Sequence, residues 1–222
     1  MITIVSGTGA ARRVVSGAGG NMWFTSGYGH SVGYFRTGAF TDVGQGHPFY
    51  ADIMWLSDRG ISRGNADGSF GSLDPISRQA MAAFLYRYAG SPNGPNPTCA
   101  VAPKTDVPVG APFCGEIAWL VTQGITNGYP DGGFHPSAPI TREAMSAFLY
   151  RFADNPNGAN PTCSSAPKLD VQVGQAFCGE ISWMIATGIS TGYPDNTFRG
   201  SQPAQRQAMA AFMHRLDGVL HP

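Results

Sequence analysis

A step of 64 residues recurs along this chain and constrains its fold more than any other feature. The step separates three aspartates, three tryptophans and three arginines: Asp42, Asp106 and Asp170; Trp55, Trp119 and Trp183; Arg78, Arg142 and Arg206. A fixed period means that one supersecondary unit has been copied, and a single copy rarely buries its own apolar face. We therefore expect one domain made of three equivalent units, with equivalent sites in each unit or between neighbours.

Composition excludes two classes of partner. The chain has 14 Lys and Arg against 14 Asp and Glu, without a basic run, so it lacks the electrostatic footprint of a nucleic-acid binder. No apolar stretch approaches the roughly 20 residues that a membrane span needs. Residues 1–20 also lack the charged start and apolar stretch of a secretory signal. We expect no nucleic acid and no membrane span.

The cysteines follow the repeat in the second and third copies and are both absent from the first. This joint absence favours pairing within a repeat, Cys99 with Cys114 and Cys163 with Cys178, one of three possible connectivities. Each bridge closes a loop of about 15 residues, worth roughly 3 kcal/mol. Free buried thiols or a metal site are the alternatives. Disulfides indicate a compartment outside the cytoplasm, so we expect a C-terminal piece of a longer secreted protein or a misplaced start.

The second copy predicts two helices. Apolar residues at helical spacing, with Pro112 in the first turn and Gly124 after the end, predict a helix over 112–123. A turn-rich segment follows, and Thr141 then predicts the N-cap of a helix over 142–152. Alanines beside the apolar stripe of each second helix predict three helices packed closely around an axis, with the first helices outside. Residues 20–25 and 32–35 alternate as in a hairpin.

The order Phe-Thr-Asp-Val, Ile-x-Trp-Leu, Gly-Ile-x-x-Gly, Asp-Gly-x-Phe and Thr-Arg-Glu-Ala-Met resembles the S-layer homology motif over 40–90, 104–153 and 168–216. The resemblance implies a mainly α fold, a pseudo-threefold spindle with a central three-helix bundle and peripheral helices, preceded by a short β-like segment. The implied divisions are 1–39, 40–90, 91–153 and 154–217, with a disulfide loop in each of the last two. Residues 1–39 form either a linker or the remnant of an upstream β domain, similar to a blade edge of virginiamycin B lyase-like propellers.

The arginines are the first candidates for binding, because each falls in the first turn of a second helix. There, unpaired backbone N–H groups and the helix dipole favour an anion, and a guanidinium binds a carboxylate in bidentate fashion. The alternative is an internal salt bridge to the Asp-Val aspartate of the same period, which could also orient the arginine and accept sugar hydroxyls. The carboxylate of a pyruvyl or uronate group fits this chemistry.

The remaining candidates share the period of 64 residues. Polar residues after the arginines either bind hydroxyls or favour the helix start, namely Gln79, Glu143 and Gln207. The three tryptophans either stack on a sugar or pack on a neighbouring repeat. Glycines permit a tight turn or a close approach of a ligand, and tyrosines follow two of them: Gly64, Gly128 and Gly192; Tyr129 and Tyr193. The Asp-Gly pairs at 67 and 131 are interpreted as turns rather than calcium ligands.

The resemblance implies a non-catalytic module that anchors a protein to the bacterial cell surface by binding an anionic, often pyruvylated, secondary cell-wall polysaccharide in grooves between repeats. The chain has no recognised catalytic motif, and its histidines do not share the period. We expect no cofactor and no metal, and the oligomeric state stays open. A protein-interaction or lattice module, and the C-terminal anchor of a secreted enzyme, are the alternatives. Sites that involve residues 199–206 are expected to be the weakest, because Ala204-Gln205 replaces Ile-Thr there.

Overall fold

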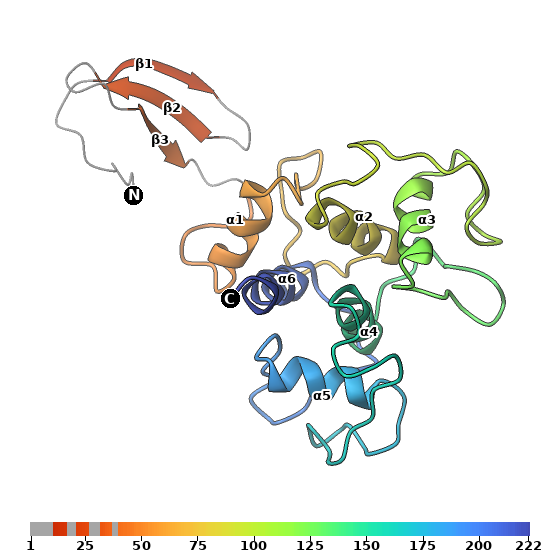
Figure 1. The fold of residues 1–222 in the computed structure, drawn as a ribbon. Helices are drawn as coiled ribbons and strands as arrows, with labels where there is room; N and C mark the ends of the chain where they lie inside the picture. The colour runs from red at the N-terminus through yellow and green to blue at the C-terminus, as the bar shows by residue number, and fades with distance from the viewer. Residues whose placement is uncertain (1–10, 17–20, 27–31, 37–39) are drawn as a thin grey trace. The chain divides into compact units, whose positions relative to one another are not determined.

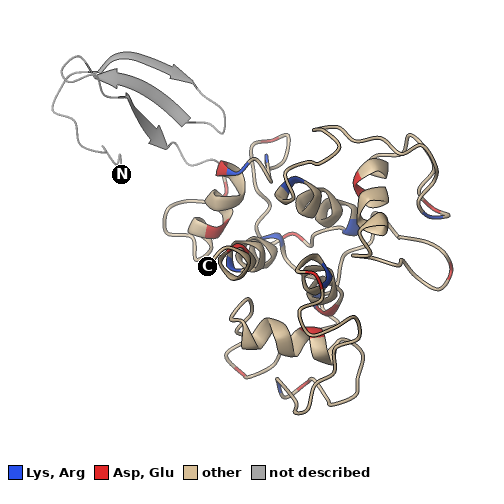
Figure 2. Ribbon diagram, viewed as in Figure 1, with Lys and Arg blue, Asp and Glu red and all other residues tan. Residues whose placement is uncertain are grey.

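The structure is a computed structural model that describes residues 11–16, 21–26 and 32–36 by their backbone and residues 40–222 in full. Its internal contacts divide the chain into two units, residues 1–72 and 73–222. Helices dominate, which confirms the mainly α class. Lys and Arg, like Asp and Glu, are scattered along the described part of the chain (Figure 2). None of the helices described is both long enough and apolar enough to cross a membrane.

The first unit contains a small antiparallel sheet and one helix. Strands β1 (Ala11–Ser16), β2 (Asn21–Ser26) and β3 (Val32–Arg36) pair in the order β1-β2-β3. Trp23 of β2 lies opposite Tyr34 of β3, so the predicted hairpin is confirmed, whereas β1 was not predicted as a strand. Helix α1 (Tyr50–Asp58) follows and buries Ile53 and Leu56.

The second unit carries five helices, α2 (Arg78–Tyr88), α3 (Cys114–Thr122), α4 (Arg142–Phe152), α5 (Cys178–Ala186) and α6 (Arg206–Leu220). Helix α4 begins where it was predicted, and the Thr141 hydroxyl accepts the Ala144 N–H at 3.2 Å. The predicted start of α3 at residue 112 is wrong by two residues. Phe113 has a left-handed φ of 62°, which the turns of a right-handed helix do not accommodate, so α3 starts after it.

Helices α2, α4 and α6 pack around one another, as predicted for the second helix of each repeat (Figure 1). The arginine at the start of each helix lies over a phenylalanine of the next, at 5.3, 5.3 and 5.6 Å from the ring centroid: Arg78 over Phe148, Arg142 over Phe212, Arg206 over Phe84. Helix α3 packs on α2, and α5 packs on α4. The second helices therefore form a three-membered core, and α3 and α5 lie outside it.

A closed ring of backbone hydrogen bonds joins the three segments that lead into these helices. The Ile76 N–H donates to the Ala204 carbonyl, the Ala204 N–H to the Ile140 carbonyl, and the Ile140 N–H to the Ile76 carbonyl, each at 2.9 Å. All three residues are buried. Since a buried N–H must find a partner, this ring holds the three helix starts in fixed register with one another.

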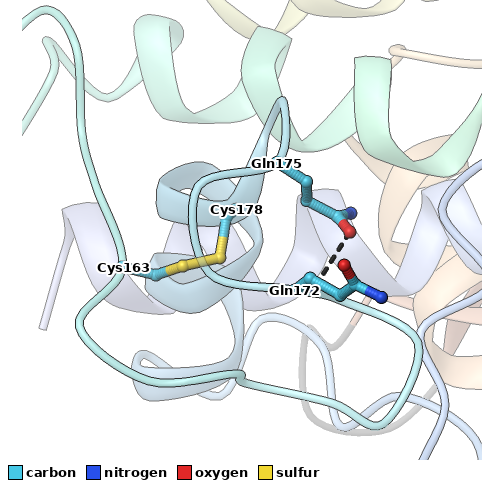
Figure 3. The surroundings of a disulfide bond; sticks show 4 residues. All are labelled: Cys163, Gln172, Gln175 and Cys178. Atoms are coloured by element: carbon cyan, nitrogen blue, oxygen red, sulfur yellow. Dashed lines mark hydrogen bonds between the residues drawn. A yellow bond between two sulfur atoms is a disulfide. The ribbon is translucent and has the colours of Figure 1, made fainter.

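Both predicted disulfides are present, Cys99–Cys114 and Cys163–Cys178, with Cα–Cα distances of 5.6 and 5.7 Å. Figure 3 shows the second bridge joining an extended loop to the first turn of α5, beside the hydrogen bond from the Gln172 N–H to the Gln175 side chain. The interpretations as free thiols or a metal site are therefore wrong. A Cβ on Gly179 would lie 2.2 Å from the Pro161 carbonyl oxygen, so the glycine after the cysteine lets the loop press against the helix.

Candidate functional site

Arg78 is buried at the start of α2, with only 4% of its surface exposed. Its Nε–H donates to the Phe134 carbonyl at 2.7 Å, and its guanidinium carbon lies 4.6 Å from the Tyr129 ring centroid and 4.7 Å from that of Phe134. Burial lowers the pKa of the Arg78 guanidinium, while Tyr129 and Asp106 act in the opposite direction. An arginine stays charged nonetheless, because its pKa starts above about 12.

The two Nη groups of Arg78 reach the surface. Among the described residues, Arg78 makes one side-chain hydrogen bond, and its Nε–H is the donor. Every fully buried side-chain nitrogen or oxygen of the described residues has a hydrogen-bond partner. The Nη groups are therefore not sealed in the core. The side chain presents a planar, charged edge outward while its Nε and its two faces are fixed by protein.

Arg142 repeats this arrangement at the start of α4. It is 5% exposed, its Nε–H donates to the Phe198 carbonyl at 2.8 Å, and its guanidinium lies 4.9 Å from the Tyr193 ring and 4.8 Å from the Phe198 ring. Arg206 is less buried than the other two, and its guanidinium lies over Phe84. The period thus gives Arg78 and Arg142 matching surroundings.

The aspartates hold the turns that receive these arginines. Asp106 accepts the Phe134 and His135 N–H groups, both at 2.7 Å, one on each carboxylate oxygen. Burial acts to raise the pKa of Asp106, but these two bonds lower it and leave it below its usual value. Asp42 and Asp170 bind the backbone at the equivalent positions.

The alternative of a salt bridge between arginine and aspartate is wrong for Arg78 and Arg142. Within residues 73–222, neither Arg78 nor Arg142 forms an ion pair with Asp106 or Asp170. Asp106 instead fixes the turn whose Phe134 carbonyl accepts the Arg78 Nε–H. The aspartate therefore orients the arginine through the backbone rather than by charge pairing.

The expectation of unpaired N–H groups at the helix starts is also wrong. The Arg78 and Gln79 N–H groups donate to the Ala138 and Pro136 carbonyls at 3.0 and 2.9 Å. At α4, Arg142 and Glu143 donate in the same way to carbonyls of the third repeat. Because carbonyls of the next repeat accept hydrogen bonds from these N–H groups, the groups are not available to bind an anion. The arginine side chains must therefore supply the attraction.

A groove of about 520 Å³ opens beside Arg78 and draws its lining from three repeats. Besides Arg78, the turn contributes Thr126 to Tyr129, helix α4 contributes Glu143 and Arg151, and Phe177 comes from the segment before α5. The structure thus brings together four predicted candidates, Arg78, Gly128, Tyr129 and Glu143. Arg151 and Phe177 were missed, although both recur at the 64-residue step, as Arg87, Arg151 and Arg215 and as Phe49, Phe113 and Phe177.

Tyr129 stands at the groove with 41% of its surface exposed, between Arg78 and His135. The His135 ring stacks on it at 4.4 Å between centroids, and His135 Nε2 lies 2.8 Å from an Asp131 carboxylate oxygen. In the third copy Arg199 takes the place of His135, with its guanidinium 3.9 Å from the Tyr193 ring centroid. In the first copy the position is glycine.

The turn at Gly128 admits no side chain. Its φ is +76°, and a Cβ would lie 2.6 Å from the Gly133 carbonyl oxygen. Gly64 and Gly192 meet carbonyl oxygens across their own turns at 2.6 and 2.7 Å. The glycines therefore close the turns that carry the groove residues.

The tryptophans lie elsewhere. Trp119 packs edge-on against Tyr86 at 5.5 Å, and Trp183, 6% exposed, does the same against Tyr150 at 5.3 Å. Neither lines the groove beside Arg78. Trp55 is half-buried beside Arg59, whose guanidinium lies 4.9 Å from its ring.

Two further sets of candidates have local partners. The Gln207 amide donates to the Gln205 side chain at 2.8 Å, and Gln79 is half-buried at the start of α2. The side chains of Asp67 and Asp131 accept backbone N–H groups two residues ahead, as turn residues do. Among the described residues, no three His, Cys, Asp or Glu side chains are grouped to hold a metal ion.

The repeated turn, its buried arginine and the central helices define a three-motif module. The family model of the S-layer homology domain matches residues 39–82, 105–146 and 171–210, together more than half of the chain. The chain therefore belongs to the S-layer homology domain family.

Three relatives are similar to parts of the chain. Cell surface glycoprotein 1 of Acetivibrio thermocellus is 28% identical over 163 residues, 71% of this chain and 7% of the relative. The cellulosome-anchoring protein of the same organism is 29% identical over 99 residues, 45% of this chain and 22% of the relative. A cell surface protein of Thermoanaerobacter kivui is 28% identical over 124 residues, 54% of this chain and 16% of the relative. The chain thus spans less than a quarter of each relative's length.

Proposed function

We propose that this chain is a non-catalytic module that holds a protein on the bacterial cell surface by binding an anionic secondary cell-wall polysaccharide in grooves between repeats. The observation that carries the proposal is the guanidinium of Arg78, fixed by the Phe134 carbonyl and two rings, with its Nη groups reaching the surface beside a groove of about 520 Å³. Two disulfides are consistent with a place outside the cytoplasm.

The chemistry of the groove suits an acidic sugar. A carboxylate of a pyruvyl ketal or a uronate pairs with the Nη edge of Arg78, and such charge-assisted pairs are about twice as strong as neutral ones. Tyr129 is half-exposed at the groove and offers its hydroxyl and the edge of its ring to the sugar, and Asn127 and Glu143 offer partners for the sugar hydroxyls. The names of two relatives, a cellulosome-anchoring protein and a cell surface glycoprotein, agree with a role in anchoring.

The proposal is tested by sedimenting the oxidised chain with bacterial sacculi that keep their attached polysaccharide or have been stripped of it by acid. We expect binding to the intact wall alone. Equal binding to both walls would overturn glycan recognition, and failure to bind either would favour a module that binds protein or forms a lattice.

A groove variant and a matched surface variant sharpen this test. Tyr129→Ala removes an exposed ring from the groove, and we expect about tenfold weaker binding, equal to about 1.4 kcal/mol. Val101→Ala shortens an apolar side chain, 76% exposed, that does not line the groove, and we expect no change. Equal losses in the two variants would contradict the assignment of the groove.

A further inference from the structure

A second hollow, of about 300 Å³, lies over the outer helix α3 and the end of α4. We call it the Trp119 hollow, and its main lining residues are Trp119, Gln123, Arg151, Phe152 and Asp154. The Trp119 and Phe152 rings are half-buried, with centroids 6.4 Å apart at an angle of 59°. Gln123 and Asp154 are exposed.

The composition of this hollow matches what a neutral sugar requires. Aromatic rings receive the apolar face of a pyranose, while an amide and a carboxylate bind its hydroxyls. Arg151 and Asp154 bring one positive and one negative charge to the hollow, so their effects offset and the lining does not favour a charged sugar. The hollow is therefore complementary to an uncharged saccharide.

The fold uses Trp119 of this lining but does not require the exposed Gln123 and Asp154 side chains. Trp119 packs on Tyr86 as Trp183 packs on Tyr150, so the tryptophan position serves both copies. Three lining residues change in the third copy, where Gln123, Phe152 and Asp154 are replaced by Thr187, Leu216 and Gly218, whereas Arg151 recurs there as Arg215. The amide and the carboxylate are thus particular to this hollow rather than a property of the repeated motif.

The Trp119 hollow adjoins the groove beside Arg78. Arg151 lines both, and its Nη1 donates to the Ile125 carbonyl at 3.3 Å. Ile125 lines the hollow, and the next residue, Thr126, lines the groove. One oligosaccharide that lies across Arg151 therefore reaches both places without leaving the surface.

We infer that the Trp119 hollow is a second saccharide subsite, which takes a neutral sugar of the same glycan whose acidic sugar occupies the groove. This inference rests on the proposed function. Two linked contacts raise affinity beyond either alone, because the second forms within an already bound ligand. Affinity should therefore increase with the length of the glycan.

The test compares a methyl glycoside that carries one pyruvyl ketal with longer synthetic oligosaccharides that carry the same ketal at one end. Isothermal titration of the full, oxidised chain should show about tenfold tighter binding of the longer ligands. The double variant Gln123→Ala, Asp154→Gly should lose most of this gain and keep the affinity for the short glycoside, because glycine accepts the left-handed φ of 62° at residue 154. Neither exposed side chain contributes to the buried core, so the fold should survive.

Thr122→Ala is the matched control, because Thr122 is exposed on the same helix and lines neither place. It should bind every ligand as the unchanged chain does. If the short glycoside binds but length adds nothing, or if the double variant keeps the gain, the subsite is refuted. If neither the short pyruvylated glycoside nor a methyl uronate glycoside of the same length binds, the proposed function itself fails.

Discussion

Replacing Arg78 by lysine separates the charge of this side chain from its geometry. Lysine keeps a positive charge but has no Nε–H to donate to the Phe134 carbonyl and no plane to lie between the Tyr129 and Phe134 rings. A hydrogen bond from a charged donor contributes about 1.5–3 kcal/mol, and the stacking of the guanidinium about 0.5–1 kcal/mol more. We expect Arg78→Lys to lower the free energy of unfolding by about 2–4 kcal/mol.

The assay is urea-induced unfolding of the oxidised chain, followed by the fluorescence of its 4 tryptophans. Arg142→Lys is a control supplied by the repeat, because its Nε bond is 2.8 Å long against 2.7 Å for Arg78, and its distances to the rings are similar. Both variants should lose stability by amounts that agree within about 0.5 kcal/mol. We therefore expect Arg78 and Arg142 to stabilise the fold as well as to bind a ligand, because both side chains are part of the buried core.

Two results would refute this reasoning. If neither lysine variant changes the midpoint of unfolding, the Nε bonds contribute nothing and the arginines serve a ligand only. If one variant unfolds much more readily than the other, equal distances do not produce equal energies here.

Three further perturbations test other parts of the structure. Asp106→Asn should lower stability by about 1 kcal/mol, because one acceptor is lost from an exposed carboxylate. The pKa of Asp106 is lowered on folding, so its ionised form stabilises the folded chain above the unfolded pKa of about 3.9. This stabilisation is lost as pH falls through the folded pKa, and Asp106→Asn should therefore lose less stability in acid than the unchanged chain. Burial raises the pKa of Glu143, so more of this side chain becomes neutral as pH falls, and its repulsion of an anionic ligand decreases. The affinity for a pyruvylated glycoside should therefore rise as pH falls. Glu143→Gln should abolish this rise when both chains are titrated with His135→Asn in place. Reduction of Cys99–Cys114 in a chain that keeps the other bridge should cost roughly 3 kcal/mol, and an unchanged urea midpoint would contradict the loop-closure argument.

The period predicted those features that each repeat builds from its own residues. The disulfides and the Thr141 cap follow from positions within one copy. The start of α3 was wrong because the left-handed φ of Phe113 belongs to the loop that the disulfide closes, and nothing in its sequence distinguishes it from the first residue of a helix.

The repeated apolar stripes also predicted the packing of the second helices, but the backbone contacts between copies could not be predicted from the period. The N–H groups of Arg78 and Gln79 donate to backbone carbonyls of the next repeat. Every residue has a backbone carbonyl, so the pattern of side chains does not indicate which carbonyls accept these bonds. The partner of the groove tyrosine was missed for another reason. His135 and Arg199 both stack at the same repeat position, but an imidazole and a guanidinium are not counted as matching residues.

The closed ring of Ile76, Ile140 and Ala204 also sets the copy number of the module. Each copy donates to one neighbour and accepts from the other, which is the head-to-tail relation that generates either a closed circle or an endless filament. With two copies, one buried N–H and one buried carbonyl would lack a partner and could pair with a second chain. With three copies, no such group is left for a fourth copy to pair with. Three is the number at which this head-to-tail pairing closes, so the module completes its own circle within one polypeptide.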